Sequence, residues 1–217
     1  MTVSVLSAAP VMAGATHSIV GEVIQSTSAY VNSAPIPYEW TITGGDIVST
    51  GSDGNALVSL PKEVSASLFQ NTKVLFERVL GRLVAQLSEG SIRAQTSGKD
   101  TLAVEASGYT VEPAKPSVSV YWVSMQPDKI VISSRRGSIQ VVENQSGDLH
   151  MVPEGHYATI SQPRSPRPAS PEASLRGSQS TKKDKPSIVI LAGQGTIASG
   201  LTVPTRIGIG PPGPTLP

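Results

Sequence analysis

The feature that most constrains the fold is a short pattern that recurs at nearly constant intervals. A glycine, a small polar residue and an isoleucine occur at residues 45–47, 90–92 and 137–139, so the glycines lie 45 and 47 residues apart. The flanks agree too, because "GRLVAQLSEGSI" (81–92) aligns without a gap with "DKIVISSRRGSI" (128–139). A period of this kind indicates a structural unit of about 46 residues that is used two to three times. Each Gly-x-Ile is predicted to be a tight turn that leads into a new strand.

The segments between these turns have the periodicity of β-strands. "TLAVEASGYTVEP" and "SVSVYWVSM" alternate apolar and polar residues, and "KIVIS" and "SIQVV" are β-branched runs bounded by turn residues. Alternation with a period of two is typical of strands that bury one face. The sequence therefore predicts an all-β fold built from repeats over residues 16–160.

Residues 62–88 leave two interpretations open. Within them, "FERVLGRLVAQL" spaces its apolar residues as an amphipathic helix would. Gly81 in its middle and the gap-free match to "DKIVIS" favour a pair of strands instead. We favour the strand pair and keep the helix as the alternative. The apolar positions are Phe76, Val79, Leu80, Leu83, Val84 and Leu87.

Charge and composition divide the chain into parts. Residues 1–160 carry 10 Lys and Arg against 14 Asp and Glu, whereas residues 161–217 carry 7 against 2. Residues 161–186 are rich in proline, serine and arginine and nearly devoid of large apolar side chains, so they are predicted to be a disordered basic linker. Residues 187–217 form a tail that is first apolar and then rich in glycine and proline.

The first residues suggest export. Residues 1–15 are uncharged, mostly small or apolar, and end in Ala13-Gly14-Ala15, which has the A-x-A pattern of a signal-peptide cleavage site. We expect this segment to be the remnant of a signal peptide and the protein to work outside the cytoplasm, in the periplasm, in the envelope or as a secreted chain. A frayed terminus or a first strand docked on the body is the alternative.

The apolar part of the tail allows two roles. Residues 187–203 contain no charge, but they are shorter than the roughly 20 apolar residues of a membrane span and are diluted by glycines. A weak membrane anchor is one interpretation. A plain tail or a strand that docks on a partner is favoured over the anchor, because the segment is rich in β-formers at Ile188, Val189, Ile190, Ile197 and Val203.

Residues that could carry chemistry are few and scattered. There is no cysteine, and no nucleophile elbow, P-loop or zinc-helix motif occurs. Gly193-Gln194-Gly195 has too few glycines to cradle a phosphate. We therefore predict that the protein is not an enzyme and binds no cofactor. His150 and His156, with Asp148 and Glu154, could form a metal site, but we expect them to be ordinary loop residues. The carboxylate pair Glu105 and Glu112 is a second candidate site. His17 is far from both in the sequence.

Aromatic residues offer one candidate surface. Tyr38 and Trp40 lie two apart and share a predicted strand face with Ile42. They could form a ledge for a carbohydrate, but we expect a pair that faces the core. Nine aromatic residues in all are too few and too scattered for a nucleic-acid platform, and the body is acidic, so no nucleic-acid partner is expected.

The order of these short motifs over residues 40–160 resembles the FecR family, the extracytoplasmic β-domain of iron-dicitrate-type transmembrane regulators. The resemblance implies a FecR-type β-domain with an interaction role in the envelope. In place of the family's Gly-Thr-x-Phe element this chain has "SVSVYWVS". The matching segments are residues 45–50 ("GDIVST"), 56–60 ("ALVSL"), 72–75 ("TKVL"), 87–92 ("LSEGSI"), 137–141 ("GSIQV") and 152–155 ("VPEG").

The sequence therefore predicts a non-catalytic interaction module that senses or scaffolds through protein contacts. One alternative is a structural subunit that assembles with itself through its tail or its strand edges. A weaker alternative is an accessory domain that binds carbohydrate or peptide.

Overall fold

The computed structural model describes residues 18–98, 100–162 and 188–192, and within these residues it contains strands and no helix. The prediction of an all-β fold is confirmed. The strands are β1 (Ile19–Val31), β2 (Ala34–Pro35), β3 (Trp40–Thr43), β4 (Ile47–Leu60), β5 (Val64–Leu68), β6 (Lys73–Val79), β7 (Arg82–Ser97), β8 (Leu102–Ala106), β9 (Tyr109–Pro113), β10 (Val118–Gln126), β11 (Lys129–Arg136), β12 (Ile139–Glu143), β13 (Leu149–Val152), β14 (His156–Ser161) and β15 (Ile188–Ala192).

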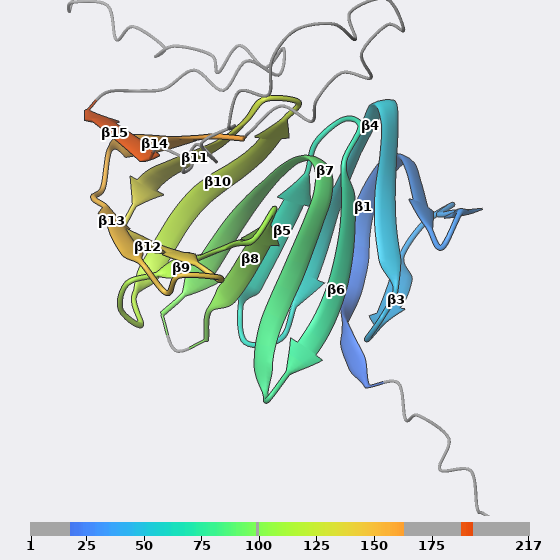
Figure 1. Ribbon diagram of the computed structural model, residues 1–217. Helices are drawn as coiled ribbons and strands as arrows, with labels where there is room; N and C mark the ends of the chain where they lie inside the picture. The colour runs from blue at the N-terminus through green and yellow to red at the C-terminus, as the bar shows by residue number, and fades with distance from the viewer. Residues whose placement is uncertain (1–17, 99, 163–187, 193–217) are drawn as a thin grey trace, which may run out of the picture.

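All of these strands belong to one hydrogen-bonded sheet, which branches at β7 (Figure 1). The first half of β7 pairs with β6 on one side and, in parallel, with β8 on the other. Its second half pairs with β5 and with β10. Two arms therefore leave β7 on the same side. We call them the β8 wing (β8, β9, β12 and β13) and the β10 wing (β10, β11, β14 and β15).

The chain builds the two wings in turn, one hairpin at a time. β8–β9 and β12–β13 are the hairpins of the β8 wing, and β10–β11 and β14–β15 are antiparallel pairs of the β10 wing. The inward rows of both wings join a single core with the strands β1 to β7. These rows are fully buried: Val104, Val111 and Val141 in the β8 wing, and Val123, Ile132 and Ala158 in the β10 wing.

The strand interpretation of residues 62–88 is confirmed, because they contain β5, β6 and the first part of β7, separated by turns. β6 and β7 form an antiparallel hairpin, and Leu80 and Gly81 occupy its turn with positive φ angles. The helix-like spacing has two sources: Leu83, Val84 and Ala85 of β7 are consecutive and all buried, and Val79 and Leu80 are exposed at the hairpin turn. A strand buried on both faces loses its alternation and can be mistaken for a helix.

The predicted Gly-x-Ile turns occur at two of the three positions. Gly45 and Gly137 have positive φ and lie directly before β4 and β12. Asp46 closes the first turn, since its carboxylate accepts hydrogen bonds from the Thr43 amide and hydroxyl, each at 2.8 Å, and from the Asn32 side chain at 2.7 Å. Gly90 differs, because it lies inside β7, at the residue where β7 exchanges β6 and β8 for β5 and β10.

Several predicted segments lie outside the described residues. Residues 1–15 do so entirely, as do the linker 161–186 beyond Gln162 and the tail 187–217 apart from β15. The boundaries drawn at residues 15, 160 and 186 stay predictions. The described part of the tail is a strand, β15, that pairs antiparallel with β14 of the same chain.

Candidate interaction surface

β15 forms one end of the sheet, and its outer edge is the main candidate for an interaction site. In register, Ile160 pairs with Ile188, Ala158 with Ile190 and Tyr157 with Leu191. β14 is the strand that pairs with β15 among the described residues, so the opposite backbone edge of β15 faces no described strand. An edge of this kind offers amide donors and carbonyl acceptors to an incoming strand.

The side chains of β15 make this edge apolar on both faces. Val189 is 48% exposed, Ile190 39% and Leu191 45%. A strand alternates its side chains between faces, so Ile190 points to the side of the core while Val189 and Leu191 point outward. Three consecutive exposed apolar residues on an end strand are unusual for a chain that remains alone, because natural edges are commonly protected by charges or proline.

The turn that leads into β14 is held by polar contacts rather than by a reactive group. The Glu154 carboxylate accepts a hydrogen bond from the Gly137 amide at 2.9 Å, and the His156 Nδ1 atom lies 3.0 Å from the Glu154 carbonyl oxygen. Both contacts fix the course of the chain before β14. They position a strand and do not assemble a catalytic group.

The histidines and carboxylates considered as metal ligands do not converge. His150 lies on β13 opposite Val141, whereas His156 lies on β14 opposite Ala192, so the two belong to different wings. Among the described residues no group of three His, Asp or Glu side chains is arranged to hold a metal ion. His17 lies outside the described residues, as do Gly193, Gln194 and Gly195.

The carboxylate pair Glu105 and Glu112 is separated by its partners. Glu112 forms an ion pair with Arg82 and accepts a hydrogen bond from Gln140 at 2.8 Å. Glu105 lies on β8 opposite Thr110. A carboxylate held by a guanidinium and an amide is committed to structure rather than to acid–base exchange.

The aromatic pair Tyr38 and Trp40 does not face the core, and this expectation was wrong. Tyr38 is 84% exposed and Trp40 38%, while Ile42 is fully buried. Tyr38 precedes β3 and lines a shallow hollow of about 470 Å³ together with Ile24 and Gln25, and Trp40 does not contribute to it. The two rings therefore do not form one ledge. The reason is that β3 lies at the margin of the sheet, where no second layer covers its first residue.

Two tyrosines have shifted acidities. Burial raises the pKa of the Tyr121 phenol far above its usual value, and the nearby Glu112 carboxylate adds to the shift. Burial, with a contribution from Glu143, also raises the pKa of Tyr109. Both shifts favour the neutral phenol, and Tyr121 donates a hydrogen bond to the carbonyl of Leu102 in the other wing. The two groups are thus structural.

Buried hydroxyl groups form a connected belt next to the branch point. The Thr72 hydroxyl donates to the Ser91 carbonyl at 3.1 Å and accepts from the Ser91 amide at 2.9 Å, and the Ser91 hydroxyl donates to the Ser124 hydroxyl at 2.7 Å. The Thr50 hydroxyl accepts from the Thr72 amide at 2.9 Å. These hydroxyls satisfy one another and the backbone, as buried polar groups must.

The described part of the chain has no helix that is long and apolar enough to cross a membrane.

Comparison with known proteins gives a likeness of fold. No protein-family model matches the sequence, and no curated protein was found to match it. Two crystal structures, at 2.50 and 1.65 Å resolution, of a "putative anti-sigma factor" from Parabacteroides distasonis are similar to this chain, each with a TM-score of 0.50 and 10% sequence identity. The similarity covers 68% of this chain and 59% of theirs, so this chain spans less than two thirds of their length. At this identity the likeness concerns the fold alone.

Proposed function

We propose that this protein is a non-catalytic interaction module of FecR-like type, which senses or scaffolds by binding another protein outside the cytoplasm. The shared fold with a protein described as an anti-sigma factor supports this, as does the order of the FecR-like motifs. The structure explains those motifs: Gly45-Asp46 closes a turn, Thr72 lies in the hydroxyl belt, and Gly90 lies at the branch. They preserve the scaffold and leave the outer faces and edges for binding.

The observation that carries the proposal is the apolar end strand β15. Strand addition supplies affinity through backbone hydrogen bonds and specificity through alternate side chains. β15 offers both, because its edge faces no described strand and Val189 and Leu191 are exposed on its outer face. The partner is an extended segment of another protein that pairs with this edge.

Photocrosslinking tests the proposal. A benzophenone amino acid is placed at Val189 of the full chain in the native host. The matched control is Leu149 on β13, which is also an exposed apolar residue on an end strand. We expect one dominant adduct with another protein from position 189 and none from 149. Equal labelling at both positions, or no adduct at 189, would contradict strand addition at β15.

Self-assembly is the second candidate, because an apolar edge can also pair with the same edge of another copy. An adduct of twice the chain mass in the crosslinking experiment would favour it. Light scattering distinguishes binding of another protein from self-assembly. If β15 binds another protein, deletion of residues 187–217 leaves the molar mass of the purified chain unchanged. If β15 joins copies of the chain, the deletion lowers the average molar mass.

The location outside the cytoplasm is tested by N-terminal sequencing of native material. Cleavage after Ala13-Gly14-Ala15 predicts a mature terminus near Thr16. Recovery of an intact Met1 would remove the argument for export.

A further inference from the structure

A cluster of two arginines and one tryptophan lies on the outer face of the sheet, where β7, β10 and β11 are adjacent. Arg93 on β7 pairs directly with Trp122 on β10, and its guanidinium lies 5.2 Å from the centre of the indole ring. Arg135 on β11 approaches the same ring at 5.9 Å. Trp122 faces outward because its neighbours Tyr121 and Val123 are fully buried.

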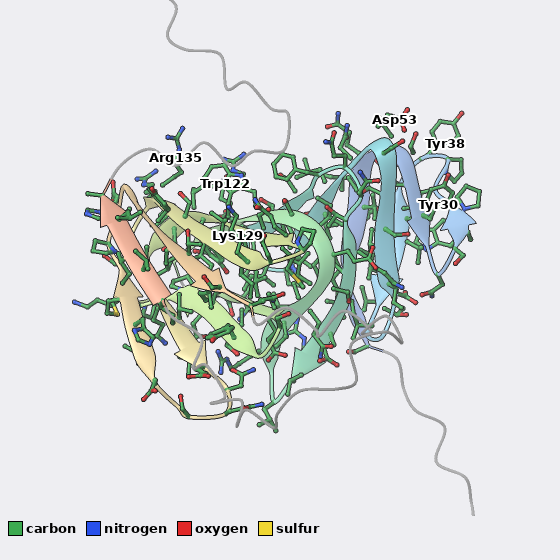
Figure 2. All side chains as sticks on the ribbon, turned by 45° about the horizontal axis from the view of Figure 1, so that its top comes forward. Tyr30, Tyr38, Asp53, Trp122, Lys129 and Arg135 are labelled. Atoms are coloured by element: carbon green, nitrogen blue, oxygen red, sulfur yellow. The ribbon has the colours of Figure 1, made fainter. Side chains whose placement is uncertain are left out.

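The charged residues on the strands of the β10 wing are of one sign. The strands of the β10 wing contain Lys129, Arg135 and Arg136 and no Asp or Glu. Figure 2 shows Trp122, Arg135 and Lys129 over this wing, apart from Tyr30, Tyr38 and Asp53 at the other end of the molecule. The wing thus presents a positive surface on a body whose residues 1–160 carry an excess of acidic groups.

None of the described carboxylates forms an ion pair with Arg93. Its Nε atom is buried and has no hydrogen-bond partner among the described residues. An arginine that serves only to stabilise a sheet face usually donates to a carboxylate or a carbonyl oxygen. Stacking on Trp122 holds the guanidinium in place and removes part of its hydration, which strengthens its attraction for an anion that arrives from outside.

Arg–Trp stacking across strands also occurs as plain surface packing, worth about 1 kcal/mol. Two observations distinguish this cluster from ordinary surface packing. Two arginines approach the same indole ring, and the strands of the β10 wing contain no acidic residue. The nearby carboxylates outside the strands are Asp128, at the β10–β11 turn, and Glu154, which holds the Gly137 amide.

The composition of the surface identifies the kind of partner. Its cations are few and alternate with apolar and aromatic side chains such as Val131 and Tyr157, whereas a nucleic acid or a sulfated polysaccharide requires a continuous cationic band. The linker of the same chain is basic and would be repelled. The acidic β8 wing of a second copy is a poor match, because Glu112 is held by Arg82 and Gln140.

We propose that the outer face around Trp122 binds an acidic segment of a partner protein, in which Arg93 and Arg135 pair with carboxylates and Trp122 contacts the apolar groups between them. This inference rests on the proposed function as an interaction module and names the chemistry of its partner. The surface is separate from the β15 edge, since β11 and β14 lie between Trp122 and β15.

The test uses the full chain with Trp40→Phe, so that fluorescence reports on Trp122, the one other tryptophan. The probe is a synthetic peptide of alternating Glu and Val; heparin, single-stranded DNA and a Lys–Val peptide serve as comparisons. We expect the Glu–Val peptide to change Trp122 fluorescence and to bind about tenfold more weakly to the variant R93Q/R135Q, as the loss of charge-assisted hydrogen bonds requires.

The matched control is K73Q/R78Q, which removes the same charge from exposed residues of β6 and should change affinity less than about twofold. This control is needed because the basic tail attracts any acidic peptide. Melting temperatures of both variants show whether the fold is intact; if R93Q/R135Q unfolds, Arg93→Lys with Arg135→Lys replaces it and should weaken binding while retaining the charge.

Each outcome decides. Equal binding by R93Q/R135Q and the control variant overturns the proposal, as does a fluorescence change with the Lys–Val peptide. If heparin or DNA binds more tightly than the Glu–Val peptide, and R93Q/R135Q loses that binding, the ligand of this surface is a polyanion and not an acidic protein segment. A doubled mass in light scattering that R93Q/R135Q abolishes makes the occupant a second copy. If the peptide fails while Val189 crosslinks to a protein, this inference falls and the interaction module stands; the reverse result removes the edge site alone.

Discussion

The β8 wing and the β10 wing leave the same strand and line the same core, yet their charges are opposite. The strands of the β8 wing carry Glu105, Glu112 and Glu143 and no Lys or Arg. Those of the β10 wing carry only basic charges. The inward rows of the two wings are equally apolar and equally buried. The two wings are therefore alike on their inner faces, which share one core, and differ on their outer faces, where a partner could bind.

The two wings also differ in what holds their outer residues. Glu112 in the β8 wing is satisfied within the chain by Arg82 and Gln140. Arg93, beside the β10 wing, has a buried Nε atom without a described acceptor. A carboxylate that is already paired gains little from binding an ion. The buried Nε atom of Arg93 cannot reach a ligand, but the other nitrogens of this guanidinium can donate charge-assisted hydrogen bonds to one. The comparison thus points to the face where Arg93 of β7 lies over Trp122 of the β10 wing as the binding side.

The largest expected effect comes from the residue at which the wings separate. A Cβ atom at Gly90 would lie 2.4 Å from both the Asn71 carbonyl oxygen and the Thr72 hydroxyl, and the φ angle of Gly90 is +80°. We expect Gly90→Ala to reduce the free energy of unfolding by about 3 kcal/mol or more, because steric overlap adds to backbone strain. Urea denaturation monitored by circular dichroism measures this loss.

Gly45→Ala is the matched control for this substitution. Gly45 has a φ angle of +95°, but no atom lies within 4 Å of its Cβ position. Strain alone should cost about 1 to 2 kcal/mol. If both variants lose the same stability, the close approach at the branch point has no energetic role.

A smaller effect is expected from the hydroxyl belt beside Gly90. Thr72→Val keeps the shape of the side chain but leaves the buried Ser91 amide without its acceptor, while the Ser91 carbonyl oxygen keeps the hydrogen bond from the Phe69 amide. The expected loss is about 2 kcal/mol in the free energy of unfolding. Thr72→Ser retains the hydroxyl and should recover most of that loss in the same urea titration; a serine variant as unstable as the valine variant would show that packing, not hydrogen bonding, is responsible.

The sequence predicted the strands well, but it did not predict the inward face of every strand or the branching of the sheet. In "SVSVYWVSM" the valines at 118 and 120 alternate with serines, which favours an inward face that includes Val118, whereas Ser119 and Tyr121 are fully buried and Val118 is 41% exposed. The repeat predicted turns at Gly45 and Gly137 but also at Gly90, where the chain continues through β7. Glycine signals a positive φ angle or a close approach, and the sequence does not say which of the two applies.

The candidate surfaces required pairing information that a single sequence does not contain. The β-forming residues of the tail predicted a docking strand, but not that β14 of the same chain would receive it. Arg93 was not singled out, because its neighbour Trp122 is 29 positions away and only the register of β7 and β10 brings them together. The exposure of Tyr38 did not follow from the sequence, because Tyr38 lies in the bend before β3 and not on the strand face of Ile42.

The smallest effect concerns the contact that joins the two wings across the core. Tyr121 of the β10 wing is fully buried and its phenol donates to the Leu102 carbonyl of the β8 wing. Burial, and then Glu112, raises its pKa above the usual value of 10.0, whereas in the unfolded chain the phenol ionises near that value. The unfolded state therefore releases this proton first as the pH rises, so the stabilisation that is complete below pH 10 declines above it.

Tyr121→Phe should lower the free energy of unfolding at pH 7 by about 1 kcal/mol, through the lost hydrogen bond. The same variant should lose less stability than the parent protein between pH 9.5 and about 11, because it lacks the group whose proton affinity differs between the two states. Thermal unfolding at several pH values measures both effects, with Tyr38→Phe as the matched substitution at an exposed tyrosine. A Tyr121→Phe profile parallel to that of the parent protein would mean that the wings are joined by apolar packing alone.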